Sequence, residues 1–251
     1  MTPPKKTVVI TGASRGLGAG MARWFIDAGY QVGLSSRGAL PFKDSNSVHT
    51  RSVDVRDPEA LKRFVTSVEE KFGSIDLWIN NAGVLAPIGP LRDAPAEELR
   101  TSIETNVLGV LYGSQVFVQH LHRNDHFGVL LNISSGAGSR GYAGWTAYCA
   151  GKSAVDRLTE ALSLEESPAR LRAHSVAPGV IDTEMQAEIR QCDEARFPMV
   201  EKFHALKANG HFNTPGFVAQ KCSEVAFSAP PPTEVLLRLP DEFASAAPEG
   251  S

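Results

Sequence analysis

A tyrosine and a lysine stand four residues apart in the segment TAYCAGK, residues 146–152. A free phenol titrates near pH 10, so Tyr148 can exchange a proton near neutral pH only in surroundings that favour the phenolate. If the segment is helical, side chains four residues apart share a face, and the ammonium of Lys152 can approach the phenol oxygen and lower its pKa. Bringing the pKa from about 10 to about 7 requires about 4 kcal/mol. A surface pair does not supply that, whereas a desolvated lysine with a further positive charge beside it could.

Two serines end the apolar run GVLLNISS, residues 128–135. We expect this run to be a strand, and in open α/β sheets ligands bind at the carboxyl ends of the strands. A hydroxyl of Ser134 or Ser135 could therefore hold a carbonyl oxygen. Taken alone, a pair of serines more often belongs to an ordinary loop without a catalytic role. Tyr–Lys pairs at this spacing are likewise common on exposed helices.

A glycine-rich turn follows the first apolar run, because TGASRGLG places Gly12, Gly16 and Gly18 directly after TVVI. Residues without a Cβ atom let the backbone turn tightly and approach a pyrophosphate at a helix N-terminus. The spacing differs from G-x-G-x-x-G, and a glycine-rich connector without a ligand is the alternative for this stretch alone. If a dinucleotide binds here, its oxidised nicotinamide supplies the positive charge that Tyr148 needs.

The second apolar run, YQVGLSS, ends without a carboxylate. In most NAD-binding sheets an acidic side chain at this point binds the ribose 2′-hydroxyl, but here Ser35, Ser36 and Arg37 stand there. Arg37 and Arg15 of the glycine turn could bind a 2′-phosphate, because the planar guanidinium matches phosphate oxygens. We therefore predict NADPH/NADP+ as the cofactor. The alternative is that both arginines are solvated surface charges.

Short β-branched runs alternate with longer amphipathic segments along most of the chain, which is typical of βαβ units and a parallel sheet. Asp57-Pro58 predicts a helix start, and apolar residues recur at helical spacing from Leu61 to Phe72. The remaining predicted helices are 17–28, 97–121 and 148–165, and the predicted strands are TVVITG, YQVGLSS, VHTRSVDV, SIDLWINN, GVLLNISS and LRAHSVAPG.

The pattern changes after Met185 to charged helical stretches, a break at NGHFNTPG and a final apolar run, EVLLRLP. We predict one domain over residues 1–251, with 185–230 as a substrate-binding excursion within it. Residues 243–251 are small and polar, and we predict a frayed tail there.

The composition excludes several functional classes. The chain has 251 residues, 42% of them hydrophobic, and a net charge of -3, so it has no basic face for nucleic acid. Three cysteines cannot all pair, which fits free thiols in a reducing compartment. No apolar run approaches 18 residues, so we expect no membrane span and a cytoplasmic protein. His120 and His122 do not share a helix face, and we expect no metal site.

Six segments resemble the short-chain dehydrogenase/reductase family and appear in the family's order over about residues 6–185: TGASRGLG, NNAG at 80–83, ETNVLG, NISS at 132–135, the Tyr148–Lys152 pair and PGVIDT at 178–183. The resemblance implies an α/β fold with a doubly wound, mostly parallel Rossmann-type sheet in three layers (αβα). It also implies hydride exchange between a nicotinamide and a carbonyl or alcohol.

The resemblance implies a role for each matched residue. Tyr148 would protonate the substrate oxygen during reduction, and Ser135 would hydrogen-bond that oxygen. Lys152 would bind the nicotinamide ribose and lower the pKa of Tyr148, and Asn106 would hold a water in a proton relay. The family often has serine where this chain has Gly151.

The cofactor-binding positions implied in the same way, together with Tyr148 and Lys152, are Gly12, Ser14, Arg15, Gly16, Leu17, Gly18, Arg37, Asp54, Val55, Asn81, Ala82, Gly83, Pro178, Gly179, Ile181 and Thr183. Three of these have structural alternatives: Asp54 could cap a turn, Asn81 could brace the sheet and Thr183 could be a helix N-cap.

The C-terminal region is similar to that of the sepiapterin reductases and bacterial benzil reductases, in MQ…IR, LKANG and VAQK. This similarity implies an NADPH-dependent reductase of a ketone or vicinal dicarbonyl, with Trp145 and residues 185–197 as candidates for lining the substrate pocket. The alternatives are an alcohol dehydrogenase that works in the oxidative direction and a non-catalytic NADP-sensing module. Helices 97–121 and 148–165 would form the surface of a homodimer or homotetramer.

Overall fold

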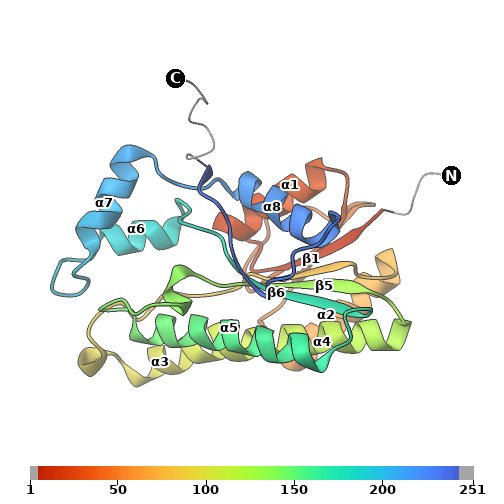
Figure 1. Cartoon of the computed structure of the whole chain (residues 1–251), viewed down its shortest axis with the longest axis horizontal. Helices are drawn as coiled ribbons and strands as arrows, with labels where there is room; N and C mark the ends of the chain where they lie inside the picture. The colour runs from red at the N-terminus through yellow and green to blue at the C-terminus, as the bar shows by residue number, and fades with distance from the viewer. Residues whose placement is uncertain (1–4, 243–251) are drawn as a thin grey trace.

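A seven-stranded parallel sheet forms the centre of the molecule in the computed structural model, which describes residues 5–242 (Figure 1). The strands lie in the order β3-β2-β1-β4-β5-β6-β7, and the order reverses direction between β1 and β4. Their bounds are β1 Thr7–Thr11, β2 Gln31–Ser36, β3 Val48–Ser52, β4 Leu77–Asn80, β5 Gly128–Ile133, β6 Leu171–Ala177 and β7 Leu236–Arg238. A ligand in such a sheet binds beyond the carboxyl ends of the strands, at the point of reversal.

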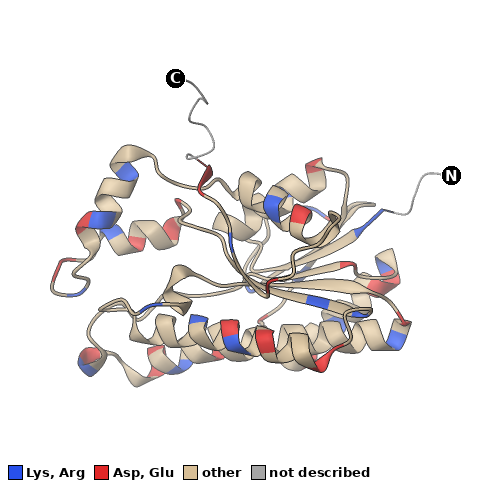
Figure 2. Cartoon of the chain, viewed as in Figure 1, with Lys and Arg blue, Asp and Glu red and all other residues tan. Residues whose placement is uncertain are grey.

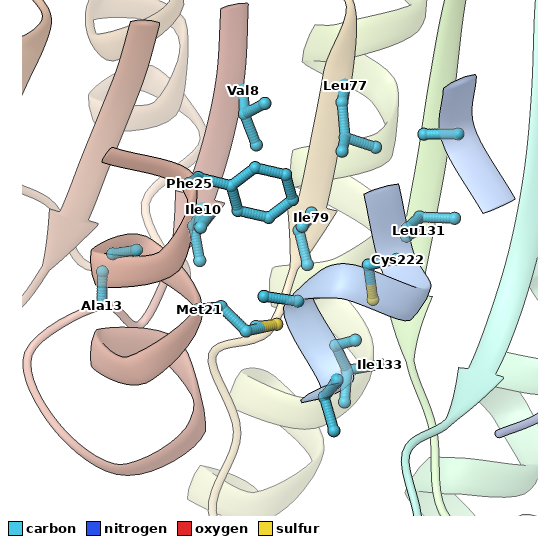
Figure 3. Close-up of a cluster of buried hydrophobic side chains, with 14 of the residues drawn as sticks. Val8, Ile10, Ala13, Met21, Phe25, Leu77, Ile79, Leu131, Ile133 and Cys222 are labelled. Atoms are coloured by element: carbon cyan, nitrogen blue, oxygen red, sulfur yellow. The ribbon is translucent and has the colours of Figure 1, made fainter. Parts of the chain in front are cut away.

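Helices cover both faces of the sheet and complete three layers. Helices α1 (Gly16–Asp27) and α8 (Pro215–Phe227) lie on one face, and α2 (Pro58–Phe72), α4 (Gly109–Asn124) and α5 (Thr146–Glu165) lie on the other (Figure 1). Figure 3 shows the core beneath α1 and α8, where Phe25, Met21 and Cys222 contact side chains of the strands. The predicted doubly wound α/β fold is confirmed.

Local signals explain several of these elements. Asp57 caps α2, and its carboxylate accepts from the backbone N–H groups of Glu59 at 2.9 Å and Ala60 at 3.0 Å. The central strands β1, β4 and β5 are buried along their whole length, as expected for parallel strands covered on both faces.

The predicted continuous helix over 97–121 is wrong in one respect. The structure has α3 (Ala96–Ile103), then a π-helical turn at Glu104–Leu108, then α4. The turn places Asn106 against the loop after β4, where its amide bonds both backbone groups of Val84. Helical periodicity in the sequence does not report a single wider turn.

Two short helices after β6, α6 (Glu184–Arg190) and α7 (Val200–Asn209), lie beyond the end of the sheet at the left of Figure 1. Residues 215–227 return as α8 to the helical layer against α1. Of the predicted substrate-binding excursion, α6 and α7 therefore form the part outside the three layers. The predicted frayed tail, 243–251, lies outside the described residues.

Charged side chains of both signs are interspersed along the helices in the view of Figure 2. Within residues 5–242, no helix has the length and apolar character needed to cross a membrane.

Candidate active site

The structure brings Tyr148, Ser135 and Lys152 together beyond the carboxyl end of β5. Ser135 follows that strand and begins a short 3-10 turn at Gly136–Gly138, while the other two lie in the first turns of α5. The Ser135 side chain lies beside Tyr148 and lowers its pKa, and Ser135 Oγ accepts from Ala137 N–H at 3.2 Å. Tyr148 is 8% exposed, so its phenol is ordered in a largely dry environment.

Lys152 is buried beneath this pair. It is 5% exposed, and its Nζ donates to the carbonyl oxygen of Ile133 at 2.8 Å. Burial lowers the pKa of Lys152 to about 8, and the carboxylate of Asp156 only partly offsets this effect. Its Nζ lies 5.6 Å from the centroid of the Tyr148 ring. The desolvated lysine that the sequence analysis required is therefore present.

The pKa of Tyr148 differs from the sequence-based expectation. Burial raises it to about 12, although the neighbouring Ser135 side chain acts in the opposite direction. The expected lowering by Lys152 does not prevail, because burial strongly disfavours the phenolate and the ammonium is bound to the carbonyl oxygen of Ile133. Lysine alone does not activate this tyrosine.

Asn106 is fully buried in the π-helical turn. Its Oδ1 accepts from Val84 N–H at 2.9 Å and its Nδ2 donates to Val84 O at 2.8 Å. A Cβ on Gly151 would lie 3.2 Å from Asn106 Cβ, so glycine at this position lets α5 pack closely on the turn. The side chain thus braces the site, and any water in a relay would have to use backbone groups of the turn.

The glycine turn between β1 and α1 fits a bound dinucleotide. Gly12 has φ +69, and a Cβ there would lie 2.7 Å from Ala82 Cα, so a side chain would displace the loop after β4. Asn81 Nδ2 donates to Thr11 O at 2.9 Å and Gly12 O at 3.2 Å. Asn81 therefore braces the turn, as its structural alternative predicted. Ser14 lies within the turn, and Leu17 and Gly18 lie in the first turn of α1, while Gly83 lies beside Asn106 and Lys152.

The two arginines predicted for a 2′-phosphate differ in their contacts. Arg15 forms an exposed ion pair with Glu184, the first residue of α6. Arg37 is exposed after β2, and its guanidinium makes no ion pair or hydrogen bond within residues 5–242. Arg37 is therefore the more available of the two.

The predicted adenine-side residues lie after β3. Asp54 accepts three hydrogen bonds from the Arg56 guanidinium at 2.6–3.0 Å, and these bonds lower the pKa of its carboxyl. It also accepts from Arg56 N–H, as a turn cap does. The Val55 side chain is buried against Gly109, so its backbone is the part left for a ligand.

The segment PGVIDT lies opposite the glycine turn. A Cβ on Gly16 would lie 3.2 Å from Thr183 Cγ2, which shows how close the two segments are. Thr183 is the N-cap residue of α6 by backbone geometry, but its side chain makes no capping hydrogen bond. Ile181 is buried, while Pro178 and Gly179 form the preceding turn, where Gly179 has φ +81.

Asn213 holds this segment in place, and the sequence analysis missed it. Its Nδ2 donates to Pro178 O at 2.9 Å and Pro240 O at 3.0 Å, and its Oδ1 accepts from Glu242 N–H at 2.7 Å. The residue is 2% exposed. A polar residue between a glycine and a proline, as in NGHFNTPG, is typical of an ordinary turn. No local signal in the sequence therefore marks Asn213 as a bracing residue.

A second missed group joins the central strands to α5. Asn80 Nδ2 donates to Asn132 Oδ1 at 2.8 Å, and Asn132 Nδ2 donates to Thr159 Oγ1 at 2.9 Å. All three side chains are buried. Because this chain of hydrogen bonds runs from β4 through β5 to α5, it fixes the helix that carries Tyr148 relative to the sheet.

An aromatic cluster lies against Tyr148 on the side of α6 and α7. Trp145 stacks on Phe197 with centroids 4.7 Å apart and contacts the Tyr148 ring edge-to-face at 5.8 Å. Phe203 packs on both Trp145 and Phe197. Of the candidates, Trp145 therefore contacts the Tyr148 ring, and Phe197 packs on Trp145.

A parallel sheet that reverses at β1 and β4, with a glycine turn and a Tyr–Lys–Ser group beyond its carboxyl edge, defines an oxidoreductase of the Rossmann type. The chain belongs to the short-chain dehydrogenase family. The family profile described as short chain dehydrogenase matches residues 6–194. Members of this family use NAD(H) or NADP(H), and the residues around the turn fit such a group.

Relatives of this chain include several characterised oxidoreductases. Benzil reductase ((S)-benzoin forming) of Bacillus cereus is 33% identical over 225 residues, covering 85% of this chain and 90% of its own. L-fucose dehydrogenase of Oryctolagus cuniculus is 37% identical over 189 residues, covering 73% and 66%.

Solved structures agree with this assignment. The KRED1-Pglu enzyme superposes with a TM-score of 0.82 at 30% identity, covering 90% of this chain and 97% of its own. ElxO with NADP bound has a TM-score of 0.79 at 27% identity, covering 93% and 96%.

Proposed function

We propose that this protein catalyses the NADPH-dependent reduction of a ketone or vicinal dicarbonyl to a hydroxy compound. The observation that carries the proposal is the placement of the Ser135 side chain beside the Tyr148 phenol, with Lys152 buried beneath them. A carbonyl oxygen placed between the two hydroxyls would meet one hydrogen-bond donor and one proton donor.

The cofactor supplies the hydride when it is bound. Tyr148 then delivers its phenolic proton to the substrate oxygen, and Ser135 hydrogen-bonds that oxygen as negative charge develops on it. A pKa near 12 keeps the phenol protonated, which is the form that reduction consumes. Lys152 would hold the nicotinamide ribose, and its ammonium would stabilise the phenolate left behind. Proton return through water bound at the Asn106 turn would restore the acid.

NADPH is the favoured cofactor because no carboxylate stands directly after β2 and the Arg37 guanidinium there makes no ion pair within residues 5–242. Glu184 holds Arg15 only through an exposed ion pair, which contributes little, so a phosphate can displace it. The relationship to ElxO, which was solved with NADP bound, supports the same choice.

A vicinal dicarbonyl is the favoured substrate class. The benzil reductase relatives cover most of this chain, and the aromatic cluster beside Tyr148 suits flat apolar substituents. An alcohol dehydrogenase acting in the oxidative direction is the second candidate, and the L-fucose dehydrogenase relatives favour it.

The test follows cofactor oxidation with aromatic diketones, simple ketones and quinones, using NADPH and NADH in parallel, and L-fucose with NADP+ and NAD+. Diketone reduction with NADPH well ahead of NADH is expected. Turnover of the sugar alone would favour the second candidate, and tight nucleotide binding without any turnover would favour an NADP-sensing module.

Tyr148→Phe provides the matched control because it removes one oxygen and retains the ring. We expect it to lower kcat by at least 1,000-fold, within the range attributed to a positioned acid and its environment, while NADPH binding changes little. An active Tyr148→Phe enzyme would contradict the assignment of the proton donor.

A further inference from the structure

Trp145 carries a buried donor that the protein does not satisfy. The residue is 6% exposed, and its Nε1 has no hydrogen-bond partner within residues 5–242. Trp78 shows the usual arrangement, since its Nε1 donates to Asn80 Oδ1 at 2.8 Å. An indole N–H can only donate, and leaving it unpaired in a buried position is unfavourable because the desolvated donor has no acceptor. Such a cost at a candidate site calls for a functional reason.

The surroundings of Trp145 offer rings rather than acceptors. Its ring contacts are with Tyr142, Tyr148, Phe197 and Phe203. The Tyr142 hydroxyl accepts from Arg140 Nε at 2.7 Å, and the Tyr148 phenol lies beside the Ser135 side chain. A hydrogen-bond acceptor beside this indole would therefore have to arrive with the substrate.

We propose that the Trp145 N–H donates to the second oxygen of a vicinal dicarbonyl and thereby selects dicarbonyls over simple ketones. This inference rests on the proposed reductase function. When the reacting oxygen lies between Ser135 and Tyr148, the second oxygen is attached to the adjacent carbon and remains close to the Tyr148 ring. The Tyr148 and Trp145 rings meet in an edge-to-face arrangement, with their centroids 5.8 Å apart.

The indole N–H would therefore distinguish a vicinal dicarbonyl from a simple ketone by the free energy with which each binds. A simple ketone of the same shape fills the site but leaves the indole N–H unsatisfied, whereas the dicarbonyl pairs it. Sites that are built to bond a substrate polar group reject analogues that lack it far more strongly than apolar pockets discriminate by shape. Trp145 would thus act as a substrate-binding residue beside the proton donor.

The experiment compares benzil with deoxybenzoin, which has the same two-ring skeleton but one carbonyl oxygen. Trp145→Phe retains a flat ring and removes the donor, and Trp145→His restores a ring N–H. We expect Trp145→Phe to lower kcat/KM for benzil at least tenfold and to leave that for deoxybenzoin within twofold. Trp145→His should recover part of the benzil preference. Trp24→Phe, on α1, is the matched control and should change neither.

Binding gives a readout that is independent of turnover. In the Tyr148→Phe background loaded with NADPH, the dissociation constant of benzil should rise about tenfold on adding Trp145→Phe, and that of deoxybenzoin should not. An unchanged benzil-to-deoxybenzoin ratio, or an equal loss with both compounds, would overturn the inference and leave Trp145 a packing residue.

The two proposals fail in distinguishable ways. If the wild-type enzyme reduces no carbonyl compound, the proposed function is wrong, and the binding ratio alone decides the role of Trp145. If the enzyme reduces both compounds and Trp145→Phe does not alter their ratio, the reductase function stands and the inference is wrong.

Discussion

Burial has opposite effects on the proton affinities of the two ionisable side chains at the site. It raises the pKa of Tyr148 to about 12 and lowers that of Lys152 to about 8, because in both cases the neutral form is favoured. The tyrosine is therefore held as an acid. The lysine remains mostly charged at pH 7 at a cost to folding.

Replacing Lys152 with methionine should reveal that cost. The unfolded lysine keeps its proton up to about pH 10.5, whereas the folded one loses it near pH 8, so the wild type gains stability between these values as pH rises. Lys152→Met should therefore be more stable than the wild type at pH 7, by at most about 3 kcal/mol before the lost bond to Ile133 is subtracted.

The difference in unfolding free energy between Lys152→Met and the wild type should shrink as pH approaches 10. Urea unfolding at several pH values measures it. A gap that widens above pH 8 would contradict the assigned direction of the pKa change. Activity should be lost at every pH, because the lysine is also proposed to bind the cofactor.

Arg37 offers a test of cofactor choice at the same scale. Arg37→Glu places a carboxylate after β2, where it would repel a 2′-phosphate and accept from a 2′-hydroxyl. NADPH binding, followed by fluorescence titration, should weaken at least tenfold, which is about 1.4 kcal/mol, while NADH binding is retained or improved. Arg23→Glu, with the same charge change on the exposed side of α1, is the control. Equal losses for both nucleotides would rule out a specific contact of Arg37 with the phosphate.

At the scale of elements, Asn213 connects three segments that are far apart in the sequence. Its hydrogen bonds join the loop before α8 to Pro178 after β6 and to Pro240 and Glu242 after β7. The buried amide of Asn213 therefore helps to hold the PGVIDT segment, together with the ion pairs of Asp182 to Arg190 and Lys207.

Asn213→Ala should destabilise the protein by about 3 kcal/mol, because it leaves buried carbonyl groups without donors. Denaturant unfolding measures this loss, and nucleotide titration should show weaker cofactor binding than in the wild type. Asn209→Ala, at the exposed end of α7, should change neither quantity. Wild-type stability in Asn213→Ala would show that the amide is not needed to hold the segment.

At the scale of the whole molecule, apolar side chains remain exposed on the helices beyond the core. Leu164 on α5 is 87% exposed, and Leu111 on α4 and Ile103 on α3 are also exposed. We propose that these helices form the interface of a homodimer or homotetramer, which would remove these side chains from water.

Leu164→Glu should then shift the protein toward a smaller species in size-exclusion chromatography with light scattering, since a carboxylate in an apolar interface is unfavourable. The wild type should elute as a dimer or tetramer. A monomeric wild type, or an unchanged mass in the variant, would exclude this surface as a required interface. Thr66→Glu, on the exposed side of α2, is a control for the added charge.

The sequence by itself determined the alternation of strands and helices, the glycine turn and the pairing of Tyr148 with Lys152. These features depend on residues within a few positions of one another, so periodicity and spacing report them directly. The start of α2 at Asp57-Pro58 is an example, because its cap and its apolar stripe are both local.

Only the tertiary structure decided what surrounds those residues. The bond from Lys152 to Ile133, the bracing of the PGVIDT segment by Asn213, the π-helical turn at Asn106 and the unpaired N–H of Trp145 all join segments that are distant in sequence or depend on burial. The physical reason is that a side chain's pKa and hydrogen-bond partners are set by the neighbours that packing brings to it, and a linear pattern of residue types does not contain those neighbours.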